Sequence, residues 1–233
     1  MGNILIIGAS GGIGLATAQQ LINEGHTVYG TYNNTNLINE YPEINWIQLD
    51  LNAIENIQIN EQLPEQIDGY FYAVGKVNLK PFNRINLNDF IEDYKIQTLG
   101  AIAVLQKILP NLKRSPQASV VFCSSVAAKV GFPFHALIGS SKGAIEGLVK
   151  SLSAEYAPAI RFNAIAPSIT ATKLTEQFIN TPEKRSVQDT KHPLKRIGEA
   201  ADNAQLASFL LTAKSSWITG QIINIDGGIS AIK

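Results

Sequence analysis

The amino-acid sequence predicts an α/β protein with one doubly wound, mostly parallel sheet and helices on both faces. Short apolar runs recur along the chain, helical patterns separate most of them, and the first run ends in a glycine-rich turn. Parallel strands need long crossovers, which helices supply, and a sheet covered on both faces has apolar strands throughout. We expect a single domain over residues 1–233, because a chain of this length with 45% hydrophobic residues suits one large core.

The apolar runs predict seven strands. The first run, Asn3-Ile4-Leu5-Ile6-Ile7, stops at Gly8, and apolar residues then recur at helical spacing over residues 13–23. The other six strands are predicted at residues 27–31, 46–49, 70–74, 120–123, 161–165 and 221–225. With right-handed crossovers these strands form a Rossmann-type sheet.

One polar segment interrupts this alternation after the sixth strand. Residues 170–198 are mostly polar and include Pro182 and Pro193. Because ligands bind at the carboxyl edge of such sheets, we expect residues 168–198 to form a lid over a substrate.

Composition limits the partners. Nineteen Lys and Arg residues balance nineteen Asp and Glu residues, so no net charge attracts nucleic acid or an anionic membrane. Cys123, the only cysteine, lies in an apolar run where a small buried side chain is expected, and an intrachain disulfide is impossible. We expect a cytoplasmic protein with a small-molecule substrate and no metal site.

The glycine-rich turn predicts a dinucleotide site. The segment Gly8-Ala9-Ser10-Gly11-Gly12-Ile13-Gly14 follows a strand and opens a helix. Glycines let the backbone approach a pyrophosphate, whose charge is met by unpaired N–H groups and the helix dipole. The predicted contacts in this loop are Gly8, Ser10, Gly12, Ile13 and Gly14.

Cofactor choice is less marked in the sequence. The acidic residue that holds an adenosine 2′-hydroxyl is absent after the second strand, where Asn33 and Asn34 stand. No basic residue is present there for a 2′-phosphate, so NADP(H) is only weakly preferred over NAD(H), with Asn33 as a neutral partner. Asp50 and Leu51 are placed to contact the adenine, although Asp50 could equally cap a helix that begins before Ala53.

Beyond this loop the chain resembles the short-chain dehydrogenase/reductase family over its whole length. The matching motifs are Leu49-Asp50-Leu51, Ala73-Val74-Gly75, Ser124-Ser125, Ser141-Lys142-Gly143-Ala144, residues 161–167, residues 218–221 and Asp226-Gly227-Gly228. The resemblance implies an NAD(P)(H)-dependent oxidoreductase and a homotetramer or homodimer that associates through two helices, at residues 91–109 and 144–156. The further cofactor contacts that it implies are Ala73, Gly75, Lys142, Pro167, Ile169 and Thr172.

The resemblance also assigns catalytic positions, and some of them depart from the family. Members use a serine to orient the substrate carbonyl, a lysine to hold the ribose, and a tyrosine four residues before that lysine to transfer a proton. Ser125 and Lys142 match the serine and the lysine, but Ile138 stands at the tyrosine position, thirteen residues after Ser125. Loss of a positioned acid costs on the order of 10²–10⁴ in rate. Gln97 replaces an asparagine that supports a water chain, and Ser168 replaces the glycine that follows Pro167.

His135 is the sequence's candidate for a relocated acid. It precedes Lys142 by seven residues, which is the tyrosine-to-lysine spacing of the enoyl-reductase branch of this superfamily. Seven residues turn a helix by about 700°, so the two side chains could share one face. The alternative is a surface or loop histidine. His192 and Tyr32 have weaker claims, and we expect both to be structural or to face solvent.

Two functions remain open from the sequence. The first is an oxidoreductase on a small carbonyl, alcohol or activated alkene, with protonation by His135 or water. The second is a catalytically impaired dinucleotide-binding protein, either a sensor or a non-catalytic subunit of an assembly.

Overall fold

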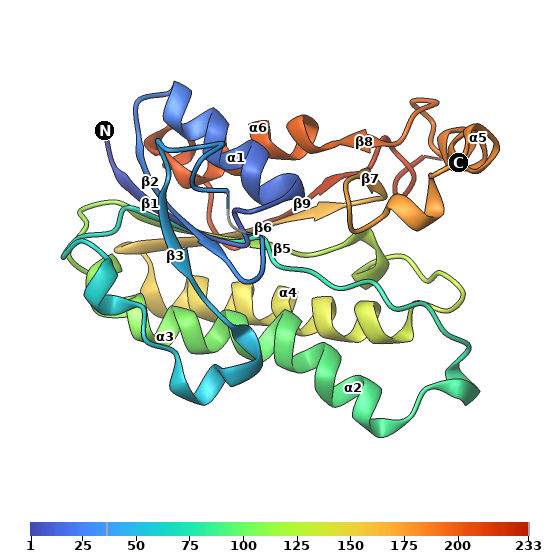
Figure 1. Ribbon diagram of the computed structural model, residues 1–233, viewed down its shortest axis with the longest axis horizontal. Helices are drawn as coiled ribbons and strands as arrows, with labels where there is room; N and C mark the ends of the chain where they lie inside the picture. The colour runs from blue at the N-terminus through green and yellow to red at the C-terminus, as the bar shows by residue number, and fades with distance from the viewer. Residues whose placement is uncertain (36, 233) are drawn as a thin grey trace.

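The computed structural model describes residues 1–35 and 37–232, in which a seven-stranded parallel sheet lies between two helical layers (Figure 1). The strand order is β3-β2-β1-β4-β5-β6-β9. The strands are β1 (Asn3–Ile7), β2 (Thr27–Tyr32), β3 (Asn45–Gln48), β4 (Gly69–Tyr72), β5 (Ala118–Cys123), β6 (Ile160–Pro167) and β9 (Ile222–Ile225). The predicted fold class is confirmed, and all seven predicted strands are present with parallel pairing throughout.

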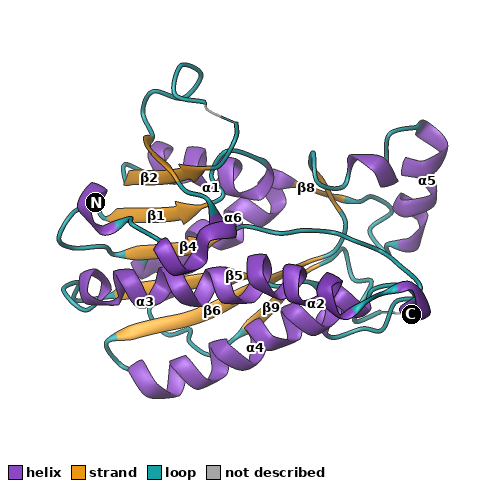
Figure 2. Ribbon diagram, turned by 60° about the horizontal axis from the view of Figure 1, so that its bottom comes forward, coloured by secondary structure: helices purple, strands orange, loops and turns teal. Residues whose placement is uncertain are grey.

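The helices divide between the two faces of the sheet. In Figures 1 and 2, α1 (Gly12–Asn23) and α6 (Ala200–Leu211) lie on one side, and α3 (Gly100–Leu112) and α4 (Ala136–Tyr156) on the other. A π-helical turn, Lys95–Leu99, joins α2 (Leu87–Tyr94) to α3. Within the described ranges, none of these helices combines the length and the apolarity that a membrane crossing requires.

The strands are apolar because helices cover both faces of the sheet. Successive side chains of a strand point to opposite faces of the sheet. Leu5 and Ile7 therefore belong to the core beneath α3 and α4, whereas Ile4 and Ile6 belong to the core beneath α1 and α6. Because neither face of β1 meets water after its half-buried first residue, Asn3, the strand continues as an unbroken apolar run from Ile4 to Ile7.

Two polar side chains of β6 bind the end of α6 and the turn before β9. The Arg161 guanidinium donates to the carbonyl oxygens of Leu210 at 3.3 Å and of Thr212 at 2.9 Å. The Asn163 side chain donates to the carbonyl oxygen of Ile218 at 2.9 Å. These bonds satisfy carbonyls that a helix end leaves without partners, and they fix the turn that leads into β9.

The polar segment after β6 contains structure that the sequence pattern did not indicate. β7 (Thr170–Ala171) pairs with β8 (Gly198–Glu199), and α5 (Pro182–Lys191) lies between these two strands in the chain. In space, α5 lies beyond the carboxyl ends of the strands of the main sheet (Figure 2). Pro182 occupies the first turn of this helix, where its missing N–H costs nothing. Thr181 caps this helix by accepting a hydrogen bond from the Lys184 backbone at 3.3 Å.

The close approach of α1 to the glycine loop gives a stability prediction. A Cβ atom at Gly14 would lie 2.2 Å from the Gly8 carbonyl oxygen, whereas one at Gly11 would meet nothing within 4 Å. Gly14→Ala is therefore expected to lower the free energy of unfolding by about 1–3 kcal/mol, because backbone must shift to admit the methyl group. Gly11→Ala is the control. Equal midpoints of the two variants in urea denaturation would contradict this explanation.

Candidate functional site

The strand order itself locates a crevice. The order reverses between β1 and β4, so the connections that follow these strands leave in opposite directions and open a space at their carboxyl ends. A cavity of about 790 Å³ lies there. Its walls include ten of the predicted cofactor residues: Gly8, Ser10, Gly12, Ile13, Ala73, Gly75, Lys142, Pro167, Ile169 and Thr172.

The glycine loop has the geometry of an anion cradle. Gly8 and Gly12 have φ angles of +84° and +51°, which L side chains rarely adopt. The Gly8 backbone donates to the Thr31 hydroxyl at 3.0 Å, which fixes the loop against β2. Gly11 is the N-cap of α1, and no side chain caps this helix start. The first-turn N–H groups and the positive end of the helix dipole are thus available to a bound anion.

Four predicted cofactor residues lie outside the cavity walls: Gly14, Asn33, Asp50 and Leu51. Gly14 instead packs against the Gly8 carbonyl and lets α1 approach β1. Asn33 is exposed, and its carbonyl accepts a hydrogen bond from Gln48 at 3.3 Å. Asp50 caps the 3₁₀ helix Leu51–Asn56, as the alternative interpretation had it, and the Leu51 side chain lies in the core. Their contacts with adenosine remain predictions.

The cavity brings together the serine and the lysine, with the isoleucine between them along the chain. Ser125 follows β5 and accepts a hydrogen bond from the Ala127 backbone at 3.2 Å, so the proton of its own hydroxyl can be donated. Ile138 and Lys142 lie one turn apart on α4 and line the same cavity. Ile138 is 9% exposed and presents only hydrocarbon to this space.

Lys142 is a buried cation at the base of this arrangement. Its side chain is almost wholly enclosed, and Nζ donates to the Val74 carbonyl oxygen at 3.4 Å. Burial lowers the pKa of the Lys142 ammonium, and the nearby Cys123 and Asp93 oppose this shift. Burial also raises the pKa of the Cys123 thiol, which forms part of the cavity wall and stays protonated.

Gln97 anchors a buried polar network behind the lysine. It lies in the π-helical turn, and its amide nitrogen donates to Asp93 at 2.8 Å and to the Ser141 hydroxyl at 3.2 Å. Its amide oxygen accepts a hydrogen bond from the Lys76 backbone at 3.4 Å. Sequence reasoning missed Asp93, although its place four residues before Gln97 puts both side chains on one helix face.

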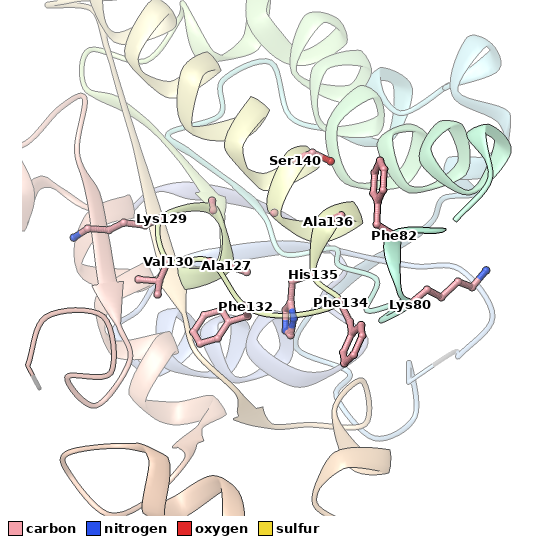
Figure 3. Close-up of a pocket in the computed structure, with 13 residues that line it drawn as sticks. Lys80, Phe82, Ala127, Lys129, Val130, Phe132, Phe134, His135, Ala136 and Ser140 are labelled. Atoms are coloured by element: carbon pink, nitrogen blue, oxygen red, sulfur yellow. The ribbon is translucent and has the colours of Figure 1, made fainter. Parts of the chain in front are cut away.

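His135 lies between the main cavity and a second cavity of about 410 Å³. Figure 3 shows its ring in a row with those of Phe132 and Phe134, on the loop that precedes α4. Its Nδ1 is 2.7 Å from the Pro133 carbonyl oxygen, and its ring centroid is 5.4 Å from that of Phe132. Because a carbonyl only accepts, Nδ1 donates to it, so Nε2 is the acceptor in the neutral form of the ring and a second donor in the protonated form.

The two weaker candidates differ in their surroundings. His192 is 2% exposed and lines the main cavity, so the expectation that it could face solvent is wrong. His192 is the C-cap of α5 and lies against the turn after β9, where a Cβ atom on Gly227 would be 3.4 Å from the imidazole. Tyr32 is half-buried, packs edge-on against Trp46 and lies outside the cavity walls.

The segment between β6 and α6 contributes apolar groups to the cavity. Leu174 and Phe178 line it, together with Thr172. These two apolar residues within a polar stretch were the available signal that the segment lies over the site. A Cβ atom on Gly75 would be 3.6 Å from Leu174, so the segment reaches the end of β4.

Comparisons with known proteins agree with this arrangement. A family model described as enoyl-(acyl carrier protein) reductase matches residues 8–230. A tropinone reductase homolog of Datura stramonium is 32% identical over 244 residues, covering 96% of this chain and 90% of the relative. The 3-oxoacyl-[acyl-carrier-protein] reductase FabG of Thermotoga maritima is 30% identical, covering 97% of this chain and 96% of the relative.

Solved structures extend the likeness to three dimensions. The structure of ElxO with NADP bound has a TM-score of 0.90 at 27% identity and covers 98% of this chain and 99% of its own. The ligand-free aldohexose dehydrogenase of Thermoplasma acidophilum has a TM-score of 0.87 at 25% identity, with 100% and 95% coverage. The likeness therefore spans the whole chain, residues 168–198 included.

The buried lysine gives a prediction about stability and pH. Its folded-state pKa lies below the unfolded value of 10.5, so burial of the charge costs stability at neutral pH, and the cost shrinks as pH rises toward 10.5. Lys142→Met is expected to raise the free energy of unfolding at pH 7, with a smaller gain at alkaline pH. Chemical denaturation across this pH range checks it. A variant less stable than the wild type at pH 7 contradicts the assignment of burial as the dominant effect.

Proposed function

We propose, since the chain belongs to the short-chain dehydrogenase/reductase family of NAD(P)-dependent oxidoreductases, that it transfers hydride to or from a small carbonyl, alcohol or activated alkene at a site that lacks the usual tyrosine. The observation that carries the proposal is one cavity lined by the glycine loop, Ser125, Ile138 and Lys142. It contains a cradle for a dinucleotide and, next to it, an apolar space for a substrate.

Different residues of the cavity wall would bind different parts of the cofactor and the substrate. The first turn of α1 would hold the pyrophosphate, because its N–H groups have no side-chain cap and its glycines leave room for phosphate oxygens. Lys142 would hold the ribose hydroxyls beside it, and Thr172 the carboxamide of the nicotinamide, whose reduced form supplies the hydride. The Ser125 hydroxyl would donate to the substrate oxygen and orient the reacting carbon.

Ile138 decides which substrates suit the site. A carbonyl that accepts hydride becomes an alkoxide and needs a proton at once, whereas a polarised alkene becomes an enolate that solvent can protonate later. We propose that Ile138 stands in the tyrosine position, which its spacing from Lys142 and its place in the cavity wall support. The protonated imidazole of His135, donating from Nε2, or water at the same place, is the proton source that the sequence suggests.

A dinucleotide-binding protein without turnover is the second candidate function. The specific observation in its favour is the hydrocarbon surface of Ile138, which offers no proton where the family has its acid. Binding of a dinucleotide without consumption of it in the presence of any carbonyl or alkene would establish this alternative.

We further propose that the protein forms a homodimer or homotetramer. Leu87 and Ile91 on α2 and Leu99 in the π-helical turn are apolar and exposed, with exposed fractions of 75%, 53% and 45%. This surface belongs to the helical layer that the family resemblance assigns to subunit contacts. Light scattering on the purified chain measures the assembly, and a monomer at all concentrations contradicts it.

Cofactor binding is the first test of the function. Calorimetric titration is expected to show binding of NADPH and of NADH, with NADPH bound more tightly, because asparagines stand at positions 33 and 34 instead of a carboxylate that would repel a 2′-phosphate. Asn33→Asp is expected to reverse this preference, and Asn34→Asp serves as the neighbouring control. A wild-type protein that binds neither dinucleotide contradicts the proposed function.

Restoring the acid is the second test. Ile138→Tyr is expected to raise kcat for ketone reduction by about tenfold or more, because a phenol one turn from Lys142 can protonate the alkoxide. Ile138→Phe adds the ring without the hydroxyl and is expected to give no such gain. If both variants behave alike in steady-state assays with NADPH, position 138 is not the place of a missing acid.

A further inference from the structure

A half-buried serine and a buried histidine form a pair in the cavity wall, apart from Ser125 and Lys142. Ser168 directly follows β6, at the position where the resembling family has glycine. His192 follows the last residue of α5. The Ser168 Oγ atom and the His192 Nε2 atom are 3.0 Å apart, and both residues line the main cavity.

The hydrogen bonds of the imidazole fix which atom carries the proton. His192 Nδ1 lies 2.8 Å from the Gln188 carbonyl oxygen, which can only accept, so Nδ1 is the N–H of the neutral ring. Nε2 then accepts from the Ser168 hydroxyl. When the ring is protonated, Nε2 donates to Ser168 Oγ instead, and the serine proton is free to point toward a third partner in the cavity.

Both members of the pair are held firmly by different elements. The Ser168 backbone donates to the Ile225 carbonyl at the end of β9 at 3.2 Å. The imidazole packs against Gly227, where an added Cβ atom would be 3.4 Å from the ring, and the Leu194 backbone donates to the Gly227 carbonyl at 3.1 Å. A proton-transfer group whose second nitrogen is oriented by a fixed acceptor is the arrangement that activated hydroxyls use in enzymes.

We infer that Ser168 and His192 deliver the proton at this site, in place of the tyrosine that position 138 lacks. The inference rests on the proposed oxidoreductase function. When hydride from the reduced dinucleotide adds to a carbonyl carbon, the C=O electron pair moves to oxygen. That oxygen takes the proton of the Ser168 hydroxyl, and Ser168 takes one from His192 Nε2. The imidazolium becomes neutral imidazole and regains its proton from water, so the products are the alcohol and the oxidised dinucleotide.

The test compares isosteric variants of the full chain with NADPH as reductant and cyclohexanone and ethyl acetoacetate as probes. Ser168→Ala and His192→Gln are each expected to lower kcat by about 10²-fold or more, because the positioned acid is lost. The dissociation constant of NADPH and the melting temperature are expected to stay at wild-type values, since Gln preserves the hydrogen bond to position 168. Ser168→Thr keeps the hydroxyl and is expected to retain most of the turnover.

The matched control is His26→Gln. This histidine precedes β2, at the amino end of the strands and outside the cavity walls, so kcat is expected to be unchanged. If the solvent deuterium isotope effect on kcat is the same in the wild type and in Ser168→Ala, the transferred proton comes from another group.

The outcomes separate two failures. Wild-type turnover that persists in Ser168→Ala and His192→Gln overturns the pair's role and leaves the oxidoreductase function standing. A wild-type protein that binds NADPH but reduces neither probe overturns the function on these carbonyls and the pair's role together. Ser168→Gly, which places the residue of the resembling family at this position, is a second variant without the hydroxyl in case Ser168→Ala does not fold. Full kcat in Ser168→Gly also overturns the inference.

Discussion

Burial of the central strands on both faces is the constraint on which the rest of the structure depends. Leu5 and Ile7 enter one core and Ile4 and Ile6 the other, so β1 requires a helical layer on each side. Two layers force the connections of β1 and β4 to leave in opposite directions, and the crevice between them follows from that divergence. The site thus owes its place to the topology of the hydrophobic core, and individual polar residues then determine its chemistry.

Burial of the polar groups behind the cavity lowers the stability of the folded protein. Burial lowers the pKa of Lys142, which means that the folded protein holds this charge against a desolvation cost. Gln97 bridges Asp93 and Ser141 across the π-helical turn, so most of the polar atoms there have partners. In the described part of the chain, Asp93 Oδ1 has no such partner. A core that was optimised for stability alone would hold hydrocarbon at these positions, which is the reason to connect them with function.

The segment after β6 connects one edge of the sheet, formed by β6 and β9, to the cavity. Ser168 is bonded to the end of β9, and His192 rests on the turn that follows β9. The same segment places Leu174 and Phe178 over the cavity. These apolar residues of the cavity wall and the Ser168–His192 pair are therefore held by the same segment, and movement of α5 away from the β9 turn would separate the imidazole from its serine.

The sequence by itself determined the fold class, the positions of seven strands and the glycine loop, because strand periodicity and glycine turns are local properties of the chain. Ser125, Ile138 and Lys142 were singled out by the resemblance to the family, which motifs along the chain carry. The sequence analysis did not predict α5, although a capping threonine followed by a proline, as in Thr181-Pro182, is typical of a helix start. The tertiary structure alone decided that His192 meets Ser168, twenty-four residues away, and that Asp50 caps a helix. Such contacts depend on how distant elements pack, and no local pattern encodes that packing.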